Sequence, residues 1–425
     1  MILKKRLIVF SLVLVTAISA QGIPGITLVK AYSDTYDTTD LKGISDETEK
    51  ISFSNIKSIM MQNSIDMQIA QNTLDNSKQE VTKINDKIKE LGYSGPSISS
   101  SIDDLEDEID KLDDEISELD KTSDTYDTDK AILEDKKSTK EKTLSTLKQY
   151  KSQRTTASRN YKKAQITYDE TVSKNVYQCQ EDFVSYLSIL SDIEQKKSNI
   201  ELKEKEAQVA KIKYDSGFLS KKDYDSSNTD TADLKNELNE LQSKEEIALK
   251  NLKLSLGISQ GEEIILSDDL GADFNAILSI NYEDDLAEML KNNTELKTLN
   301  MQIDWEYDDE DEEDDEDDDH DYENYSLEND ELNLEKKSIS LEINFKEQYN
   351  KLMNDYNSLK SSYDNIQTNQ ESYALQGKKY SFGFASKNDL DKSKVELDKI
   401  MNDFNNLRNQ FYLDYLSYIQ MKEGY

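Results

Sequence analysis

The feature that most constrains this chain is an internal duplication. An eleven-residue motif at positions 213–223 recurs at 379–389, an offset of 166 residues, with seven identical positions. Apolar residues around both motifs recur at the same offset and at spacings of three, four and seven, the pattern of an amphipathic helix. A unit that occurs twice is expected to fold alike twice. The sequence therefore predicts two antiparallel pairs of long helices, each joined by a short turn.

Each motif has the residues of a glycine turn followed by a serine cap: Gly217, Ser220 and Asp223 in the first copy, and Gly383, Ser386 and Asp389 in the second. Glycine accepts the left-handed conformation that ends a helix, a serine hydroxyl caps the next helix, and an aspartate three residues later favours the helix dipole. A continuous helix from Thr128 to Asp215 would be about 130 Å long, and one from Leu327 to Phe382 about 85 Å. Such lengths fit a coiled-coil rod or a barrel of helices.

The first copy carries an extra segment, residues 93–157. Ile and Leu keep a spacing of three and four along its first half, which is the seam of a coiled coil: Ile102, Leu105, Ile109, Leu112, Ile116 and Leu119. Acidic residues surround this seam, whereas lysines are frequent in the returning half. We favour an antiparallel hairpin held by opposite charges, although the same pattern would suit a parallel dimer.

The N-terminus has the form of an export signal, residues 1–31. Three basic residues, Lys4, Lys5 and Arg6, precede an apolar stretch at 7–20. Cleavage is expected after Ala31, with a site after Ser19 as the alternative and an uncleaved anchor also open. The rest of the sequence has no apolar run of about 20 residues, so we expect no direct bilayer span in the mature chain. The predicted location is the cell envelope or the cell surface.

Composition excludes several classes of function. The chain has 88 acidic and 52 basic residues, a formal charge of −36, which argues against nucleic acid as a partner. Its single cysteine, Cys179, and single histidine, His320, argue against a disulfide framework, a zinc site and a catalytic triad. Cys179 is expected to be a small core residue. We expect no enzyme, no cofactor and no metal, because amphipathic helices alone imply no catalytic pocket.

The second copy carries an acidic run, within residues 306–325, in which positions 308–319 are all Asp or Glu. Self-repulsion and the lack of apolar residues predict a disordered, solvated loop. A loose cation sponge is the functional alternative. The spacing of a calcium-binding loop is not present.

On these residues the chain resembles the TolC family of outer-membrane efflux proteins. The resemblance is carried by the ordered set of heads, turns and helix end: Ile56-x3-Met60-x2-Asn63 and Leu286-x3-Leu290-x2-Asn293, Tyr214-x2-Gly217-x2-Ser220 and Tyr380-x2-Gly383-x2-Ser386, and Leu252-x3-Leu256-Gly257. It places the first helical repeat at 50–260, a linker at 261–280 and the second repeat at 281–422.

The resemblance implies a homotrimer whose helices form a hollow α-barrel, a non-enzymatic conduit that works with an adaptor (membrane fusion) protein and an inner-membrane or ABC-type pump. It implies that the glycine turns are the tips that contact the adaptor. It further implies that Asp223 and Tyr380 help to hold the entrance closed and that Asp389 belongs to a constricting acidic ring. Two residues depart from the family pattern: Ala385 replaces the arginine of the lock, and Lys392 replaces the second aspartate of the ring.

The charged hairpin and the acidic run occupy the places where the family has membrane strands. Neither could face lipid, because a charge at the bilayer centre costs several kcal/mol. The predicted fold is therefore all-α, an elongated antiparallel long-helix or coiled-coil architecture with an internal duplication, a TolC-like α-barrel protomer without the transmembrane β-strands. The alternative function is a structural or interaction coiled-coil protein of the cell surface. Trimerisation discriminates the two, since a barrel needs two apolar faces on each helix.

Overall fold

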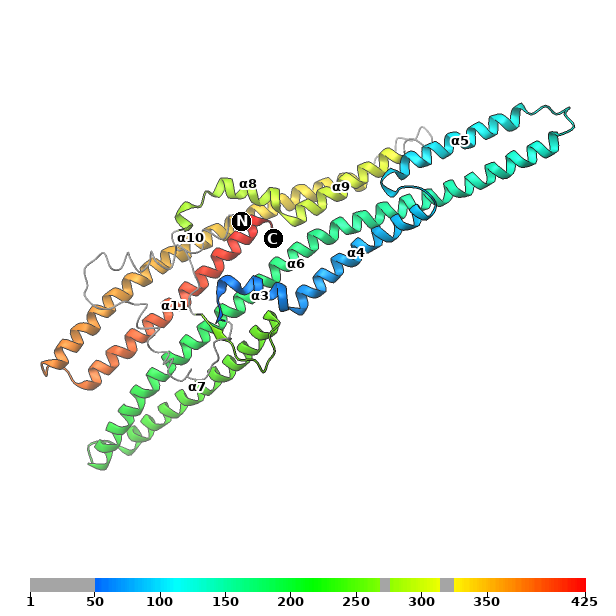
Figure 1. The fold of residues 1–425 in the computed structure, drawn as a ribbon. Helices are drawn as coiled ribbons and strands as arrows, with labels where there is room; N and C mark the ends of the chain where they lie inside the picture. The colour runs from blue at the N-terminus through cyan, green and yellow to red at the C-terminus, as the bar shows by residue number, and fades with distance from the viewer. Residues whose placement is uncertain (1–49, 268–275, 314–324) are drawn as a thin grey trace. The chain divides into compact units, whose positions relative to one another are not determined.

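The computed structural model describes residues 50–267, 276–313 and 325–425. The long helices are α4 (Ile65–Glu90), α5 (Ile98–Glu118), α6 (Tyr126–Asp215), α7 (Lys221–Leu256), α9 (Thr294–Glu313), α10 (Tyr325–Ser381) and α11 (Lys387–Glu423). The short elements are β1 (Lys50–Ile51), η3 (Phe53–Asn55), α3 (Ile56–Asn63), η4 (Gly95–Ser97), β2 (Ile265–Leu266), η5 (Ala276–Ser279) and α8 (Tyr282–Asn292). The predicted fold class, all-α with long antiparallel helices, is confirmed (Figure 1). The chain divides into two units, Met67–Val172 and the remainder, and each is described separately.

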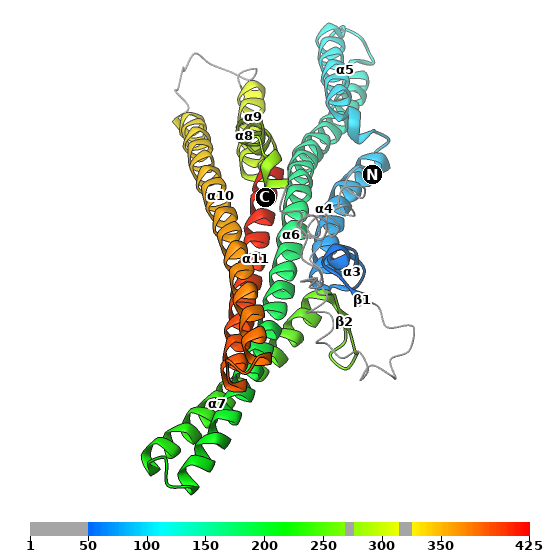
Figure 2. The ribbon, with the colours of Figure 1, turned by 90° about the vertical axis from the view of Figure 1, so that its left-hand side faces the viewer.

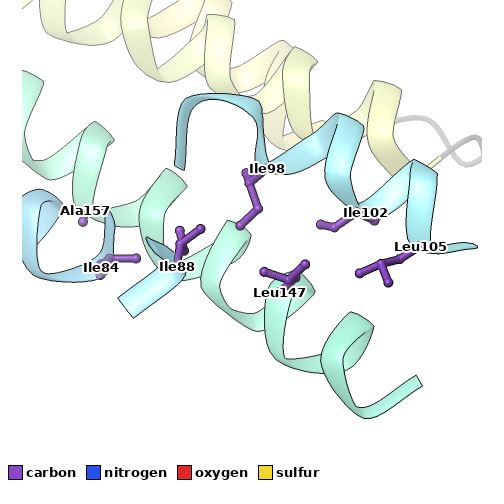
Figure 3. Close-up of a cluster of buried hydrophobic side chains, with 7 residues drawn as sticks. All are labelled: Ile84, Ile88, Ile98, Ile102, Leu105, Leu147 and Ala157. Carbon is purple, nitrogen blue, oxygen red and sulfur yellow. The ribbon is translucent and has the colours of Figure 1, made fainter. Parts of the chain in front are cut away.

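The unit of residues 67–172 is built around the predicted seam. Its core gathers isoleucines from α4, isoleucine and leucine from α5, and two residues from α6: Ile84, Ile88, Ile98, Ile102, Leu105, Leu147 and Ala157 (Figure 3). Leu147 and Ile88 are fully buried. Burial of one such aliphatic side chain contributes about 1.5–3 kcal/mol, so this cluster dominates the stability of the unit.

Ion pairs connect the two arms of the hairpin within this unit. Lys137 Nζ lies 2.6 Å from Asp113 Oδ1, Lys148 Nζ lies 2.7 Å from Glu106 Oε1, and Lys140 pairs with Glu108. As the residue number on α5 falls, its partner on α6 rises, which is the antiparallel arrangement. The hairpin prediction is confirmed within a single chain. Solvent screens these exposed pairs, so the charges select the orientation of the arms and the apolar seam supplies the stability.

The other unit contains the two predicted helical pairs. Residues 173–215 of α6 lie antiparallel to α7, and α10 lies antiparallel to α11 (Figures 1 and 2). Aromatic and aliphatic side chains fill the second pair, with Phe345 and Leu352 on α10 packed against Phe411 and Tyr418 on α11. The rings of Phe345 and Tyr418 stack with centroids 4.8 Å apart. In the first pair Cys179 is fully buried, as predicted, and burial raises the pKa of its thiol to about 12.

The heads of the two repeats join the returning helices through glycines. Gly257 ends α7 at φ 73° and Gly424 ends α11 at φ 98°. A Cβ at Gly257 would lie 2.2 Å from the Asn63 carbonyl oxygen, and one at Gly424 would lie 2.2 Å from that of Asn292. Each repeat therefore closes by pressing a glycine against the chain where its two head helices meet.

This geometry corrects the register that we expected for the heads. Ser64 caps α3 with its N–H on the Met60 carbonyl, and Asn293 caps α8 in the same way on Met289. The heads therefore correspond at an offset of 229 residues, rather than the 230 implied by matching Asn63 with Asn293. Met60 and Met289 are the buried equivalents. The expected pairing of Met60 with Leu290 was wrong because apolar residues occupy neighbouring positions on α8, so that the helical spacing fits either register.

Two short strands in this unit were not predicted. β1 and β2 pair in parallel, with Lys50 opposite Ile265 and Ile51 opposite Leu266, and the Ser267 N–H donates to the Ile51 carbonyl at 2.8 Å. This pairing returns part of the expected linker, 261–280, to the start of the first repeat. Two residues per strand are too few to produce a recognisable alternation in a sequence.

The acidic run begins inside a helix rather than in a loop. α9 continues to Glu313, and the Tyr307 hydroxyl donates to Glu331 of α10 at 2.7 Å. Packing of α9 on α10 extends the helix into the acidic residues. Residues 314–324, like the expected signal segment at 1–31, lie outside the described residues. No helix in the described ranges combines the length and the apolar character needed to cross a bilayer.

The closing glycine of the first repeat gives a stability prediction. Gly257→Ala should lower the free energy of unfolding by about 2 kcal/mol or more, because it combines a left-handed φ with a clash against backbone. Gly377→Ala is the matched control, since a Cβ there meets nothing within 4 Å and Gly377 lies inside α10. That variant should be stabilised by about 0.5–1 kcal/mol. Urea unfolding of both variants measures the difference, and equal midpoints would contradict the described closure.

Candidate functional site

The two tips are built alike in atomic detail. At the first tip the Gly217 N–H donates to the Tyr214 carbonyl at 2.9 Å and the Phe218 N–H donates to Lys213 at 2.7 Å. At the second tip the equivalent bonds run from Gly383 to Tyr380 and from Phe384 to Lys379, at 3.0 and 2.8 Å. Both glycines are left-handed, with φ 78° and 77°. These paired bonds satisfy carbonyls that a helix end leaves free, and they confirm the predicted turns.

The predicted serine caps are also present. Ser220 Oγ accepts the Asp223 N–H at 3.2 Å, and Ser386 Oγ accepts the Asp389 N–H at 3.1 Å. The second cap is reciprocal, because the Ser386 N–H donates to Asp389 Oδ2 at 3.0 Å. Hydrogen bonds from the Ser386 hydroxyl and backbone lower the pKa of Asp389. Asp389 therefore stays ionised at any pH near neutrality.

Aromatic side chains project from both turns. Phe218 and Phe384 are each 84% exposed, and Phe382 is 75% exposed. The turn bonds involve only backbone, so the structure of the turn does not require these rings. Large apolar groups that are exposed on an ordered turn mark an interaction surface.

The residues that support the tips differ between the repeats. Tyr214 stacks on Tyr224 with centroids 5.0 Å apart and planes at 8°. Tyr380 instead carries Lys387 over its ring at 5.7 Å, because Leu390 stands at the position equivalent to Tyr224. The first tip is therefore stiffened by an aromatic stack, and the second by a cation–π contact.

The four residues expected at a gate are not joined to one another in the described residues. The Asp223 carboxylate accepts the Ser220 hydroxyl at 2.7 Å, and the ring of Tyr380 faces Lys387. Asp389 is held by Ser386, as above. Lys392 Nζ lies 3.0 Å from Glu206 Oε1 on α6. Within one chain Asp223 and Asp389 are bonded to the serines that cap α7 and α11, and Lys392 ties the second pair to the first.

A polar joint between the repeats was not predicted. We define it as the contact of α6 with α11 between Ser173 and Ser198 on α6 and between Asp398 and Gln420 on α11. Asn409 Nδ2 donates to Ser188 Oγ at 3.0 Å, Asn402 Nδ2 to Asp192 Oδ1 at 2.8 Å, and Ser198 Oγ to Asp398 Oδ2 at 2.6 Å. The amides of Asn402 and Asn409 are buried. These side chains look like ordinary surface residues in the sequence, which is why the joint was missed.

The joint continues toward the heads with two further hydrogen bonds. Tyr177 donates to the Leu413 carbonyl at 3.4 Å, and Gln420 donates to the Ser173 carbonyl at 3.1 Å. Both hydrogen bonds join α6 to α11 near the heads. The joint thus runs from the heads, through the buried amides, toward the tips.

The duplication leaves two surfaces equivalent to this joint without a partner among the described residues, and we call them the open edges. The offset of 166 carries the α6 side onto α10 and the α11 side onto α7, and the fully buried pair Leu252 and Tyr418 obeys this offset. The α10 edge is Ile339, Ile343, Asn354, Asn357 and Ser358. The α7 edge is Asn236, Glu240, Ser243, Ile247 and Leu254. All ten are exposed.

Large apolar side chains lie at the head-proximal ends of both open edges. Ile343 is 55% exposed at the position of Tyr177, and Ile247 is 60% exposed at the position of Leu413. In the joint, these two positions contact each other. Apolar groups thus lie in the open at the places where the equivalent residues are in contact.

Within residues 50–267, 276–313 and 325–425, no group of three or more His, Cys, Asp or Glu side chains is arranged to hold a metal ion.

Comparison with known proteins gives likeness of fold only. No family model matches the sequence, and no curated protein matches it either. Solved structures of outer membrane channels are similar. The Campylobacter jejuni CmeC channel is 10% identical over 65% of this chain and 68% of its own, with a TM-score of 0.42. VceC of Vibrio cholerae is 9% identical over 88% and 96%, with a TM-score of 0.47. CusC is 9% identical over 88% and 95%, with a TM-score of 0.48. Similarity this distant carries no information on activity.

The reciprocal cap at the second tip gives a local prediction. Ser386→Ala should destabilise the start of α11 by about 1 kcal/mol, because the Asp389 N–H loses its acceptor and the Asp389 carboxylate loses the Ser386 hydroxyl. Amide hydrogen exchange should show faster exchange in the first turn of α11. Ser372→Ala is the matched control, since Ser372 is exposed in mid-helix and bonds only to the Thr368 carbonyl. If both variants exchange alike, the cap does not hold the tip.

Proposed function

We propose that this chain is a TolC-like component of an envelope efflux or export conduit, which assembles as a homotrimer and works with an adaptor and a membrane pump. In this proposal the protein is not an enzyme. Its helices form the wall of the conduit, and its tips form the end that docks on the adaptor. The fold and the internal duplication are the basis for the resemblance, and the open edges are the observation that carries the assembly.

The two open edges are chemically complementary when one chain's α10 is set against α7 of the next. The equivalences of the joint place Ser358 opposite Glu240, a hydroxyl donor opposite a carboxylate acceptor. They place Asn357 opposite Asn236, and Ile343 opposite Ile247. Every polar group in these pairs finds a hydrogen-bond partner, as buried polar groups require. A contact of one edge with a different edge is heterologous, and such contacts form a ring when the rotation between neighbours closes after three copies.

Charge near the tips supports an entrance rather than a continuous seal. Within one chain Lys205 lies 3.6 Å from Asp391, and this attraction ties the pairs together. The equivalent residues on the open edges are Glu371 and Asp225, which carry like charges. Neighbouring copies would therefore repel one another at the tips while their heads associate. In a ring, Asp223 and Asp389 would form an acidic entrance, with Tyr380 and Lys392 beside it as further gate candidates.

The exposed rings give the tips a partner surface. Phe218 and Phe384 lie on turns whose geometry does not depend on them, so their exposure is available for a partner. We assign Tyr214, Gly217 and Ser220, with Gly383 and Ser386, to the surface that contacts the adaptor.

Light scattering on the chain from residue 32 onward tests the assembly. We expect a mass three times that of one chain at micromolar concentration. Ile343→Glu should give monomers with unchanged helical circular dichroism, because the edge would then bury a charge.

Leu375→Glu is the matched control for this experiment. Leu375 is 54% exposed on the same helix, but its equivalent Val209 is also exposed, so the position lies outside the joint. This variant should remain trimeric. A wild-type chain that stays monomeric would remove the conduit proposal and favour a structural coiled-coil protein of the cell surface.

A further inference from the structure

Two carboxyl groups meet between α10 and α11. Asp355 of α10 lies within hydrogen-bond reach of Asp414 of α11, and Asp414 is only 4% exposed. The Oδ2 atoms of both residues are buried, and no donor group of the described residues reaches either of them. A buried acceptor without a donor costs about 1–3 kcal/mol, and two facing carboxylates add repulsion.

Among the described residues, Lys351 supplies the positive charge that faces Asp355 and Asp414. Lys351 Nζ lies 2.6 Å from Asp414 Oδ1, and Gln410 Nε2 donates to the same oxygen at 3.2 Å. α6 contributes Tyr177 and Glu181 on its side of the cluster, and neither is a cation. Asp414 is therefore satisfied on one oxygen by Lys351, while the facing oxygens of the pair have only each other.

The first helical pair shows that the fold does not need these acids. At the offset of 166, Ile189 and Ala248 stand in place of Asp355 and Asp414. Both replacements are apolar, and neither can ionise. The acid pair is thus a property of the second pair alone.

We propose that Asp355 and Asp414 share a single proton, and that loss of this proton loosens α10 from α11. The bridging proton supplies the donor that both Oδ2 atoms lack, so the protonated pair holds the helices together. The second helical pair is in this way a pH-sensitive element of the chain. The inference rests on the packing of α10 and α11 in one chain and is independent of assembly.

The direction of the pH dependence follows from the environment of Asp355. Burial, followed by the contact with Asp414, raises the pKa of Asp355 above its ordinary value, and Lys351 opposes this in part. Between the ordinary and the raised pKa, the folded chain holds a proton that the unfolded chain has released. Stability contributed by the pair is therefore full below the ordinary pKa and is lost as pH rises through the raised one.

Asp355→Asn tests the proposal, because an amide donates a hydrogen bond at every pH. We expect the variant to gain stability relative to the wild type as pH rises from about 5 to about 8, with the difference in Tm changing by about 2–4 °C. Glu347→Gln is the control, since it removes an exposed carboxylate from the same helix. Its Tm difference should be independent of pH.

A double variant, Asp355→Ile with Asp414→Ala, copies the first helical pair and guards against a failure of the amide to fit. It should fold and should lose the same pH dependence. Infrared difference spectra at about pH 5 should show a protonated carboxyl band in the wild type that is missing in Asp355→Asn. A Tm difference that stays constant with pH, or a wild type without the band, would overturn the proposal.

Discussion

The buried amides between α6 and α11 are the interaction on which the arrangement of the two repeats depends. Asn402 and Asn409 each lose water on burial and are satisfied only when Asp192 and Ser188 stand opposite. Sliding one helix by a turn would leave these groups without partners, at about 1–3 kcal/mol for each. Apolar stripes tolerate such a slip far better, because any aliphatic group can replace another. Polarity at the joint therefore fixes the register of α6 against α11 within this unit.

The proposed assembly follows from the duplication, because it repeats the joint between α6 and α11 with the equivalent helices of two chains. Each repeat has two equivalent sides, one on its first long helix and one on its second. The joint uses α6 of the first repeat and α11 of the second, so the equivalent sides on α10 and α7 stay exposed. These open edges keep exposed isoleucines at positions where the internal joint makes contact, and Ser358 and Glu240 replace one hydrogen-bonding pair with another of the same kind. The acid pair of Asp355 and Asp414 lies between α10 and α11 rather than on an open edge. The proposed proton therefore acts on the packing of these two helices.

Turns and caps formed by neighbouring residues could be predicted from the sequence, whereas polar contacts between distant residues could not. Gly217, Gly383 and their cap serines determine their own turns through contacts within a few residues, and the α5 seam repeats in the sequence as it packs in space. The head register was one residue wrong, because Met289 and Leu290 are both apolar and both satisfy a helical spacing. Buried asparagines and the facing aspartates could not be found, since a polar residue in a charged helix carries no sign of what it will meet. The gate roles of Asp223 and Lys392 remain predictions that depend on a second copy.

Disulfide trapping between the open edges tests the central claim most directly. Asn357→Cys and Asn236→Cys occupy the positions equivalent to Ser191 and Asn402, which are hydrogen-bonded in the joint. The native Cys179 is fully buried, so it should not compete. The account predicts that mild oxidation of the double variant gives covalent dimers and trimers, that a mixture of the single variants gives dimers, and that either single variant alone gives monomers. A double variant that remains monomeric under oxidation would contradict it.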